Sequence, residues 1–306
     1  MNDIILHHYE LSPYSEKIRA LLGYCDLPWQ SVLVSPSPPR PGLSPLTGGY
    51  RRIPVMQIGA DIYCDTRLIA KKLAEISGHP ELYPDDDEVR ELTEWADTRL
   101  FQIAMTCSIG RQAYTNLKGY FTVREALRMT WDRVLMARGA NMPKIGPRRA
   151  ARELHDFLRD FEKRIAAGYC FGEQPCITDF AIYLSLYFSQ VRLGAGHLDE
   201  YPAVLGWLER MIAIGHGHRS DITAKQALQI ATESQPAAPS AGDCAPFAPG
   251  DVLRIAPADY GVDPTIGVLV GADADSWVLQ REDSALGRLQ VHFPKTGYSV
   301  SRQAAS

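Results

Sequence analysis

The segment that most constrains the fold of this chain is residues 9–19, with the sequence YELSPYSEKIR. A short apolar run at residues 4–6 precedes it, and apolar residues at helical spacing follow it as far as Cys25. Ser12 stands where an N-cap is expected, and Pro13 occupies the first helical position. The pattern predicts a strand, a tight loop and a helix whose first turn offers free N–H groups and a positive dipole end to an anion such as a thiolate. The alternative interpretation of Ser12 is a simple helix cap.

The tetrapeptide at residues 12–15, SPYS, stands where thioredoxin-like redox proteins carry Cys-Pro-Tyr-Cys. Both cysteines are absent, so this loop cannot cycle a disulfide. The six cysteines of the chain form no CxxC pair, and the eight histidines show no metal-ligand spacing. We therefore predict reduced thiols, a cytoplasmic location and no metal site.

Composition excludes several classes of function. At 306 residues the chain is long enough for about two or three domains. Hydrophobic residues at 45% and charged residues at 22% are ordinary globular values. The net charge of -4 gives no reason to expect a nucleic-acid partner. The first residues do not have the pattern of a signal peptide, and no apolar run approaches the length of a membrane span.

Four segments follow one another along the chain. Residues 1–80 alternate strands and helices in the order β-α-β-loop-β-β-α, which predicts a thioredoxin-like α/β domain. Residues 84–233 read as an all-helical bundle, which includes a helix at 122–138 and another at 222–231. Residues 234–249 are rich in Ala, Pro and Ser and read as a linker. Residues 250–306 carry five short strand patterns, which predict a small, separable all-β SH3-like barrel of unknown role.

Three motifs in the first segment occur in a fixed order. They are SPYSEKIR at 12–19, RIPV at 52–55 and DTRLI at 65–69, the last beginning eleven residues after Pro54. Together they resemble the N-terminal domain of cytosolic glutathione transferases, in the layout of classes that use serine or cysteine, such as tau, zeta and omega. The helical segment is similar to the second domain of that superfamily. The resemblance does not extend to residues 250–306.

The resemblance implies a site for glutathione. Ser12 would donate its O–H to the glutathione thiolate, with Tyr9 and then Ser15 as alternatives. Arg52 would lie near the glycine carboxylate, and Asp65 and Thr66 would hold the γ-glutamyl group. The Ile53 backbone would pair with the cysteinyl part of glutathione, beside a cis peptide bond to Pro54. An acceptor pocket between the domains would be lined by Tyr14, Met105, Ile109, Arg111, Gln112 and Tyr114. Each of these six residues could equally be an ordinary core or surface residue.

The function implied by the resemblance is that of a homodimeric, cytoplasmic glutathione transferase. It would activate glutathione for attack on a small electrophile, with no metal. The alternative is a non-catalytic module of the same fold, whose C-terminal barrel docks a protein partner. Retention on immobilised glutathione would separate the two hypotheses, because the second expects none.

Overall fold

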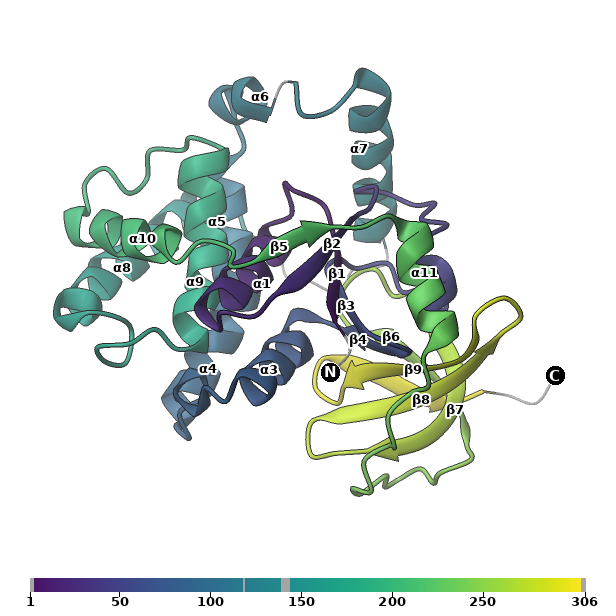
Figure 1. Cartoon of the computed structure of the whole chain (residues 1–306). Helices are drawn as coiled ribbons and strands as arrows, with labels where there is room; N and C mark the ends of the chain where they lie inside the picture. Colours follow the sequence, from purple (N-terminus) through teal and green to yellow (C-terminus); the bar gives the residue numbers. More distant parts are fainter. Residues whose placement is uncertain (1–2, 118, 139–143, 304–306) are drawn as a thin grey trace.

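The computed structural model describes residues 3–117, 119–138 and 144–303. Its first elements are β1 (Ile4–His8), α1 (Pro13–Tyr24), β2 (Trp29–Leu33), α2 (Ser44–Thr47), β3 (Val55–Ile58), β4 (Asp61–Cys64) and α3 (Thr66–Ser77). β2 lies parallel to β1, and β3 pairs antiparallel with both β1 and β4. This is a thioredoxin-like domain, as the sequence predicted (Figure 1).

Local signals position the two helices that face the site. The N-cap of α1 is Ser12, whose Oγ accepts a hydrogen bond from the Ser15 backbone N–H at 3.2 Å. The N-cap of α3 is Asp65, whose Oδ1 accepts from the Arg67 backbone N–H at 3.0 Å. Each cap satisfies an N–H group that the first helical turn leaves without a partner.

The helical domain is arranged around one buried helix. Its elements are η1 (Pro80–Leu82), α4 (Asp87–Trp95), η2 (Ala96–Leu100), α5 (Phe101–Ser108), α6 (Arg111–Leu117), α7 (Val123–Arg138), α8 (Pro147–Arg164), η3 (Ile165–Ala167), α9 (Ile177–Tyr187), η4 (Phe188–Arg192) and α10 (Pro202–Ala213). α9 is buried at every position but the last, which fits a sequence that is apolar nearly all round the helix. At its start, the Asp179 carboxylate accepts from the backbone N–H groups of Cys170 and Cys176 and from the indole N–H of Trp207.

The chain then returns to the sheet. β5 (Arg219–Asp221) pairs parallel with β2, and α11 (Ala224–Glu233) packs Ala227 against Ile5 and Val32. The sequence placed a helix at these residues but assigned it to the helical bundle. It instead lies beside the sheet because its small apolar face matches the strands.

The last five strands are β6 (Val252–Pro257), β7 (Thr265–Ala272), β8 (Ser276–Asp283), β9 (Gly287–Pro294) and β10 (Tyr298–Arg302). They form an antiparallel sheet in the order β10-β6-β7-β8-β9, and β9 pairs parallel with β4. The described strands therefore make one sheet in the order β10-β6-β7-β8-β9-β4-β3-β1-β2-β5 (Figure 1). The predicted strands are present, but the SH3-like barrel is not confirmed, since the free edge of β9 joins the first domain.

The apolar core also continues across this junction. Buried Leu46 and Ile62 of the first domain belong to the same cluster as Leu253, Val291 and Phe293 of the C-terminal strands. The connecting segment is packed as well, because the Ala237 N–H donates to Asp61 at 2.8 Å. The prediction of a tail that folds separately is therefore at odds with a shared core. In the described ranges, no helix has the length and apolarity needed to cross a membrane.

Candidate functional site

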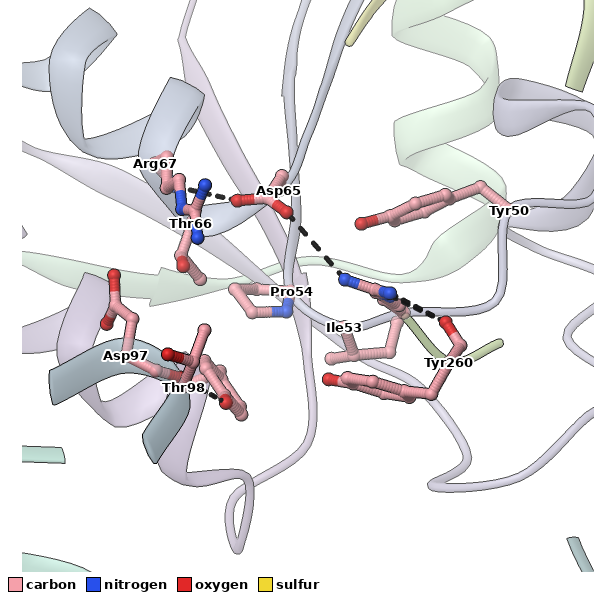
Figure 2. A pocket seen from close by; sticks show the side chains of 11 residues that line it. Tyr50, Ile53, Pro54, Asp65, Thr66, Arg67, Asp97, Thr98 and Tyr260 are labelled. Carbon is pink, nitrogen blue, oxygen red and sulfur yellow. Dashed lines mark hydrogen bonds and ion pairs between the residues drawn. The ribbon is translucent and has the colours of Figure 1, made fainter. Parts of the chain in front are cut away.

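Two adjoining cavities lie between the first domain, the helical domain and the C-terminal strands. The smaller has a volume of about 60 Å³ and the larger about 460 Å³. The residues that line both are Tyr14, Arg52, Ile53, Asp97, Thr98 and Tyr260. Figure 2 shows the smaller cavity, with Thr66 and Asp65 near Pro54 and with Tyr50 and Tyr260 farther along the same site. A small ligand would have space for one end in each cavity.

Ser12 lines the larger cavity at the N-terminus of α1. Its Oγ already accepts the Ser15 N–H, but this bond uses an oxygen lone pair and leaves the Ser12 O–H as a donor. The side chain is therefore a helix cap and can also donate to an anion in the cavity. The partial positive charge at the start of α1 favours an anion at the same place.

The two alternatives to Ser12 differ in position. Tyr9 lines the larger cavity, and its hydroxyl accepts from Arg133 Nη2 at 3.4 Å. Ser15 is fully buried and lines neither cavity. The geometry therefore favours Ser12 or Tyr9 over Ser15 as a group that touches a ligand.

Buried charges attach the start of α1 to the helical domain. Lys17 Nζ donates to both carboxylate oxygens of Asp97 at 2.7 Å, and both side chains are buried. One residue earlier, Glu16 pairs with Arg19 and accepts from Tyr183 and His216 at 2.9 Å. Burial alone would raise the pKa of Glu16, but the His216 hydrogen bond and Arg19 lower it to about 2. The carboxylate stays charged, and α1 is held firmly against its neighbours.

The residues of the second and third motifs meet at the smaller cavity. The peptide bond between Ile53 and Pro54 is cis, as the resemblance implied, and both residues line the cavity. Thr66 lines it at the start of α3. Asp65 lines it too, with φ of 80°, a backbone conformation that is costly for a residue other than glycine. Strained backbone of this kind is concentrated at functional sites.

Arg52 reaches the smaller cavity among residues of the C-terminal strands. Its guanidinium forms an ion pair with Asp259 and lies 4.1 Å from the centre of the Tyr260 ring. Its Nη1 is 4.0 Å from Asp65 Oδ2, which also accepts from the Tyr298 hydroxyl at 3.0 Å. The sequence offered no motif for Asp259, Tyr260 or Tyr298, since they lie outside the part of the chain that resembles the family.

Arg40 adds a positive charge to the larger cavity. Its three guanidinium nitrogens donate to the backbone carbonyls of Ser35, Pro36 and Arg51 at 2.5–2.8 Å. Within the described ranges it forms no ion pair, although it is buried. Burial lowers its pKa to about 10, so the side chain remains charged at neutral pH. A carboxylate of a ligand would balance this charge.

The larger cavity has an apolar wall that differs from the predicted acceptor pocket. Tyr14 lines it, and its ring lies 5.0 Å from that of Phe101. Met105, Ile109, Arg111, Gln112 and Tyr114 are described, but they line neither cavity. Ile109 and Tyr114 are 80% and 72% exposed. The residues that make the wall are Leu11, Phe101, Leu117, Phe121, Met129, Met136 and Phe188.

Metal ligands do not gather anywhere in the part of the chain that the structure describes, since no group of three or more His, Cys, Asp or Glu side chains is placed to hold an ion. All six cysteines are free thiols. The polar groups that line the two cavities are hydroxyl groups, arginines and carboxylates.

Comparison with known proteins identifies the family of this fold. A family model described as the N-terminal domain of glutathione S-transferase matches residues 6–81. The solved structure of a GST-like protein from Pseudomonas syringae is 32% identical, aligns with 99% of this chain and 100% of its own, and has a TM-score of 0.81. FzlA from C. crescentus is 21% identical over 68% of this chain and 87% of its own, with a TM-score of 0.47. A search of curated protein sequences gave no significant match.

A glutathione transferase from Burkholderia graminis, solved with two glutathione molecules bound per subunit, is 17% identical over 69% of this chain and 84% of its own, with a TM-score of 0.49. The Pseudomonas syringae protein is the informative relative, because the likeness extends over both chains from end to end. It includes the C-terminal strands. The fold and the matched N-terminal domain define a protein of the glutathione transferase type. The chain belongs to the glutathione transferase superfamily.

Proposed function

We propose that this protein binds glutathione across the two cavities and activates its thiol for attack on a small electrophile. The observation that carries the proposal is the convergence of Ser12, the cis Ile53–Pro54 pair and the Asp65–Thr66 helix start on one site. These residues come from three separated motifs, and the fold brings them together. Glutathione has a thiol between two charged ends, which fits a donor flanked by charged groups.

The chemistry follows from the position of Ser12. A serine hydroxyl is too weak a base to take the thiol proton at neutral pH, so that proton leaves to solvent. The Ser12 O–H then donates to the sulfur anion at the N-terminus of α1, which lowers the thiol pKa. The thiolate forms a bond to the electrophilic carbon of the acceptor, and the leaving group departs with its electron pair.

The acceptor is proposed to lie in the larger cavity against its apolar wall. Phe101, Met136 and Phe188 offer an apolar surface next to Ser12. The reacting carbon would thus be held beside the sulfur while the rest of the acceptor is removed from water. A planar apolar electrophile, such as an activated aryl halide, is a suitable probe.

A cytoplasmic homodimer is part of the same proposal. The free state of all six cysteines supports a reducing compartment. On α7, Leu127 and Val134 are 68% and 42% exposed, and an apolar face of this kind is a suitable surface for a second copy of the chain. The solution mass measured by light scattering tests the dimer.

The test of the function is a calorimetric titration of the purified chain with glutathione, followed by a rate measurement with an activated aryl halide. We expect saturable binding and a rate that depends on glutathione and enzyme concentration. Oxidised glutathione serves as the control, because it lacks a free thiol and cannot form the conjugate. If glutathione neither binds nor is retained on a column, the site has another role, and the interaction-module hypothesis is favoured.

A further inference from the structure

Arg52 and Asp65, which both line the smaller cavity, are held by residues of the C-terminal segment that follows β5. Arg52 Nε donates to the Tyr260 backbone carbonyl at 3.2 Å, and Nη2 donates to the same oxygen at 2.6 Å. Nη2 also pairs with Asp259, and the guanidinium stacks on the Tyr260 ring. Tyr298 donates to Asp65 at 3.0 Å. Each of the two charged side chains therefore has its orientation set from outside the first domain.

The remaining donors of Arg52 point to a ligand. A guanidinium has five N–H groups, and the two on Nη1 make no hydrogen bond to any residue in the described ranges. The nearest carboxylate oxygen to Nη1 is Asp65 Oδ2, at 4.0 Å. Because the Arg52 side chain is only 14% exposed and lines the smaller cavity, a carboxylate bound there could accept from Nη1.

The spacing decides which carboxylate of glutathione this is. An extended tripeptide spans about 10 Å, at roughly 3.3 Å per residue. The distance from Arg52 Nη1 to Asp65 Oδ2 is 4.0 Å, much shorter than this span. The two side chains would therefore bind groups at the same end of the ligand. Asp65 and Thr66 lie at the start of α3, where the γ-glutamyl group is proposed to bind. The glycine carboxylate would then lie nearer Arg40, at the larger cavity.

We propose that the C-terminal strands complete the glutathione site. Asp259 and Tyr260, in the loop between β6 and β7, position Arg52 for the α-carboxylate of the γ-glutamyl group. Tyr298, at the start of β10, positions Asp65 for the α-ammonium. The proposal rests on the glutathione-binding function argued above, and it makes the tail a part of ligand recognition rather than an appended module.

The hydrogen-bond network around Tyr298 supports this arrangement. The Tyr298 hydroxyl lies 2.9 Å from the Tyr50 hydroxyl and donates to Asp65. Burial and the Asp65 charge raise the pKa values of both tyrosines well above the usual range, so both hydroxyls keep their protons. The Tyr298 hydroxyl donates its proton to the Asp65 carboxylate, which leaves the Tyr50 hydroxyl to donate to the Tyr298 oxygen. Asp65 Oδ1 is used by the α3 cap, which fixes both oxygens of this carboxylate.

The test compares four substitutions in the full-length chain by calorimetry. They are Tyr260→Ala, Tyr260→Phe, Asp259→Asn and the control Val262→Ala, which changes an exposed residue of the same loop. We expect Tyr260→Ala and Asp259→Asn to weaken glutathione binding by roughly three- to tenfold, the scale for losing a cation–π or charge contact at a partly buried site. Tyr260→Phe keeps the ring and should bind as the wild type does, as should Val262→Ala. Melting temperatures verify that each variant is folded.

A second ligand locates the effect. γ-Glutamylcysteine lacks the glycine, so its loss of affinity in Tyr260→Ala should equal that of glutathione if Arg52 serves the γ-glutamyl end. A loss seen with glutathione but absent with γ-glutamylcysteine would place Arg52 at the glycine end and overturn the assignment. Equal glutathione affinity in wild type, Tyr260→Ala and Asp259→Asn would overturn the role of the loop. If the wild type itself does not bind glutathione, the proposed function fails, which is a separate and distinguishable result.

Kinetics separate positioning from chemistry. At saturating glutathione, the conjugation rate of Tyr260→Ala should approach that of the wild type, because the thiol end is supported elsewhere. A fall in kcat with unchanged KM for glutathione would show that the loop acts on the reaction step, contrary to the proposal.

Discussion

The two ends of the candidate site are supported by different parts of the molecule. The thiol end, at Ser12, depends on α1, which is attached to the helical domain by the buried pair of Lys17 with Asp97 and by the Tyr183 hydroxyl, which donates to Glu16. The other end, at Asp65 and Arg52, is supported by Tyr298 of β10 and by Asp259 and Tyr260 of the β6–β7 loop. The first support is made of buried charges and the second of hydroxyls, rings and a partly exposed ion pair.

Because they differ in this way, the support of the thiol end and the support of the Asp65–Arg52 end should have different roles. Buried ion pairs are rigid and costly to break, which suits the end where a fraction of an ångström changes the reaction rate. The aromatic contact and the Asp259 pair orient Arg52 but leave the two N–H groups on its Nη1, which suits an end that must still bind a charged ligand. Changes to the first support should therefore alter chemistry or folding, and changes to the second should alter affinity.

Removal of residues 240–306 should have the largest effect. It takes away the β9 partner of β4 and exposes the part of the shared core formed by residues such as Ile62. We expect the 1–239 chain to aggregate or to melt far below the full-length protein, since an exposed strand edge and apolar core favour association. Melting temperature and solution mass measure this. A soluble 1–239 chain that binds glutathione with normal affinity would show that the second support is dispensable.

Substitution of Ser12 by alanine tests the thiol end. The loss of one donor to the thiolate should lower the conjugation rate by roughly ten- to a thousandfold and leave glutathione affinity within several-fold. The helix should also lose about 1 kcal/mol from its missing cap. Ser15→Ala is the matched control, because it removes a buried hydroxyl one turn away that does not line the cavity. An unchanged rate in Ser12→Ala, together with a lost rate in Tyr9→Phe, would transfer the role to Tyr9.

The buried histidines of β1, His7 and His8, should make the free energy of unfolding depend on pH. Burial lowers the pKa of His7 to about 4, from an unfolded value of 6.5. Between these values the unfolded chain binds more protons, so the free energy of unfolding falls as the pH drops, by about 2 kcal/mol for His7 between pH 6.5 and 4.5. Burial and Arg19 similarly lower the pKa of His8 to about 3. Denaturant unfolding at several pH values measures the slope.

His7→Gln should flatten that slope, because the variant no longer takes up the proton on unfolding. His218→Gln is the control, since the His218 side chain is 73% exposed. A slope that is unchanged in His7→Gln but reduced in His218→Gln would contradict the assignment of the acid sensitivity to the buried strand.

The features that could be predicted from sequence depend on neighbouring residues. The Ser12 cap follows from local sequence, and the cis bond at Pro54 was implied by the family resemblance; both are present. The contact of Tyr260 with Arg52 joins residues more than two hundred positions apart, and no spacing in the sequence encodes it. The shared core was missed for the same reason, since a run of short alternating strands predicts a sheet but not the strand with which its edge pairs.

α7 shows how an amphipathic pattern can mislead. Leu127, Trp131 and Val134 recur at helical spacing on one face of it, and an apolar face of this kind usually packs inward. In the structure these three side chains are 68%, 61% and 42% exposed. Periodicity identifies a helix and its apolar face, but it does not say which neighbour covers that face. The cavity is instead faced by Met129 and Met136, which the pattern did not single out.

The smallest expected effect concerns the acceptor, which lies between the two supported ends. Met136→Ala removes an apolar group from the wall of the larger cavity and should raise the KM for an apolar electrophile roughly three- to tenfold, the scale for losing part of a buried side chain. Glutathione affinity should change less than this KM, because Met136 belongs to the apolar wall of the larger cavity, whereas Asp65 and Thr66, proposed to hold the γ-glutamyl group, line the smaller one. Tyr114→Ala is the control: the sequence assigned Tyr114 to the acceptor pocket, but the side chain is exposed and lines neither cavity. Steady-state rates at fixed, saturating glutathione measure both variants. A higher KM in Tyr114→Ala with no change in Met136→Ala would place the acceptor on the outer face of the helices, away from Ser12, and the reaction geometry proposed here would then be wrong.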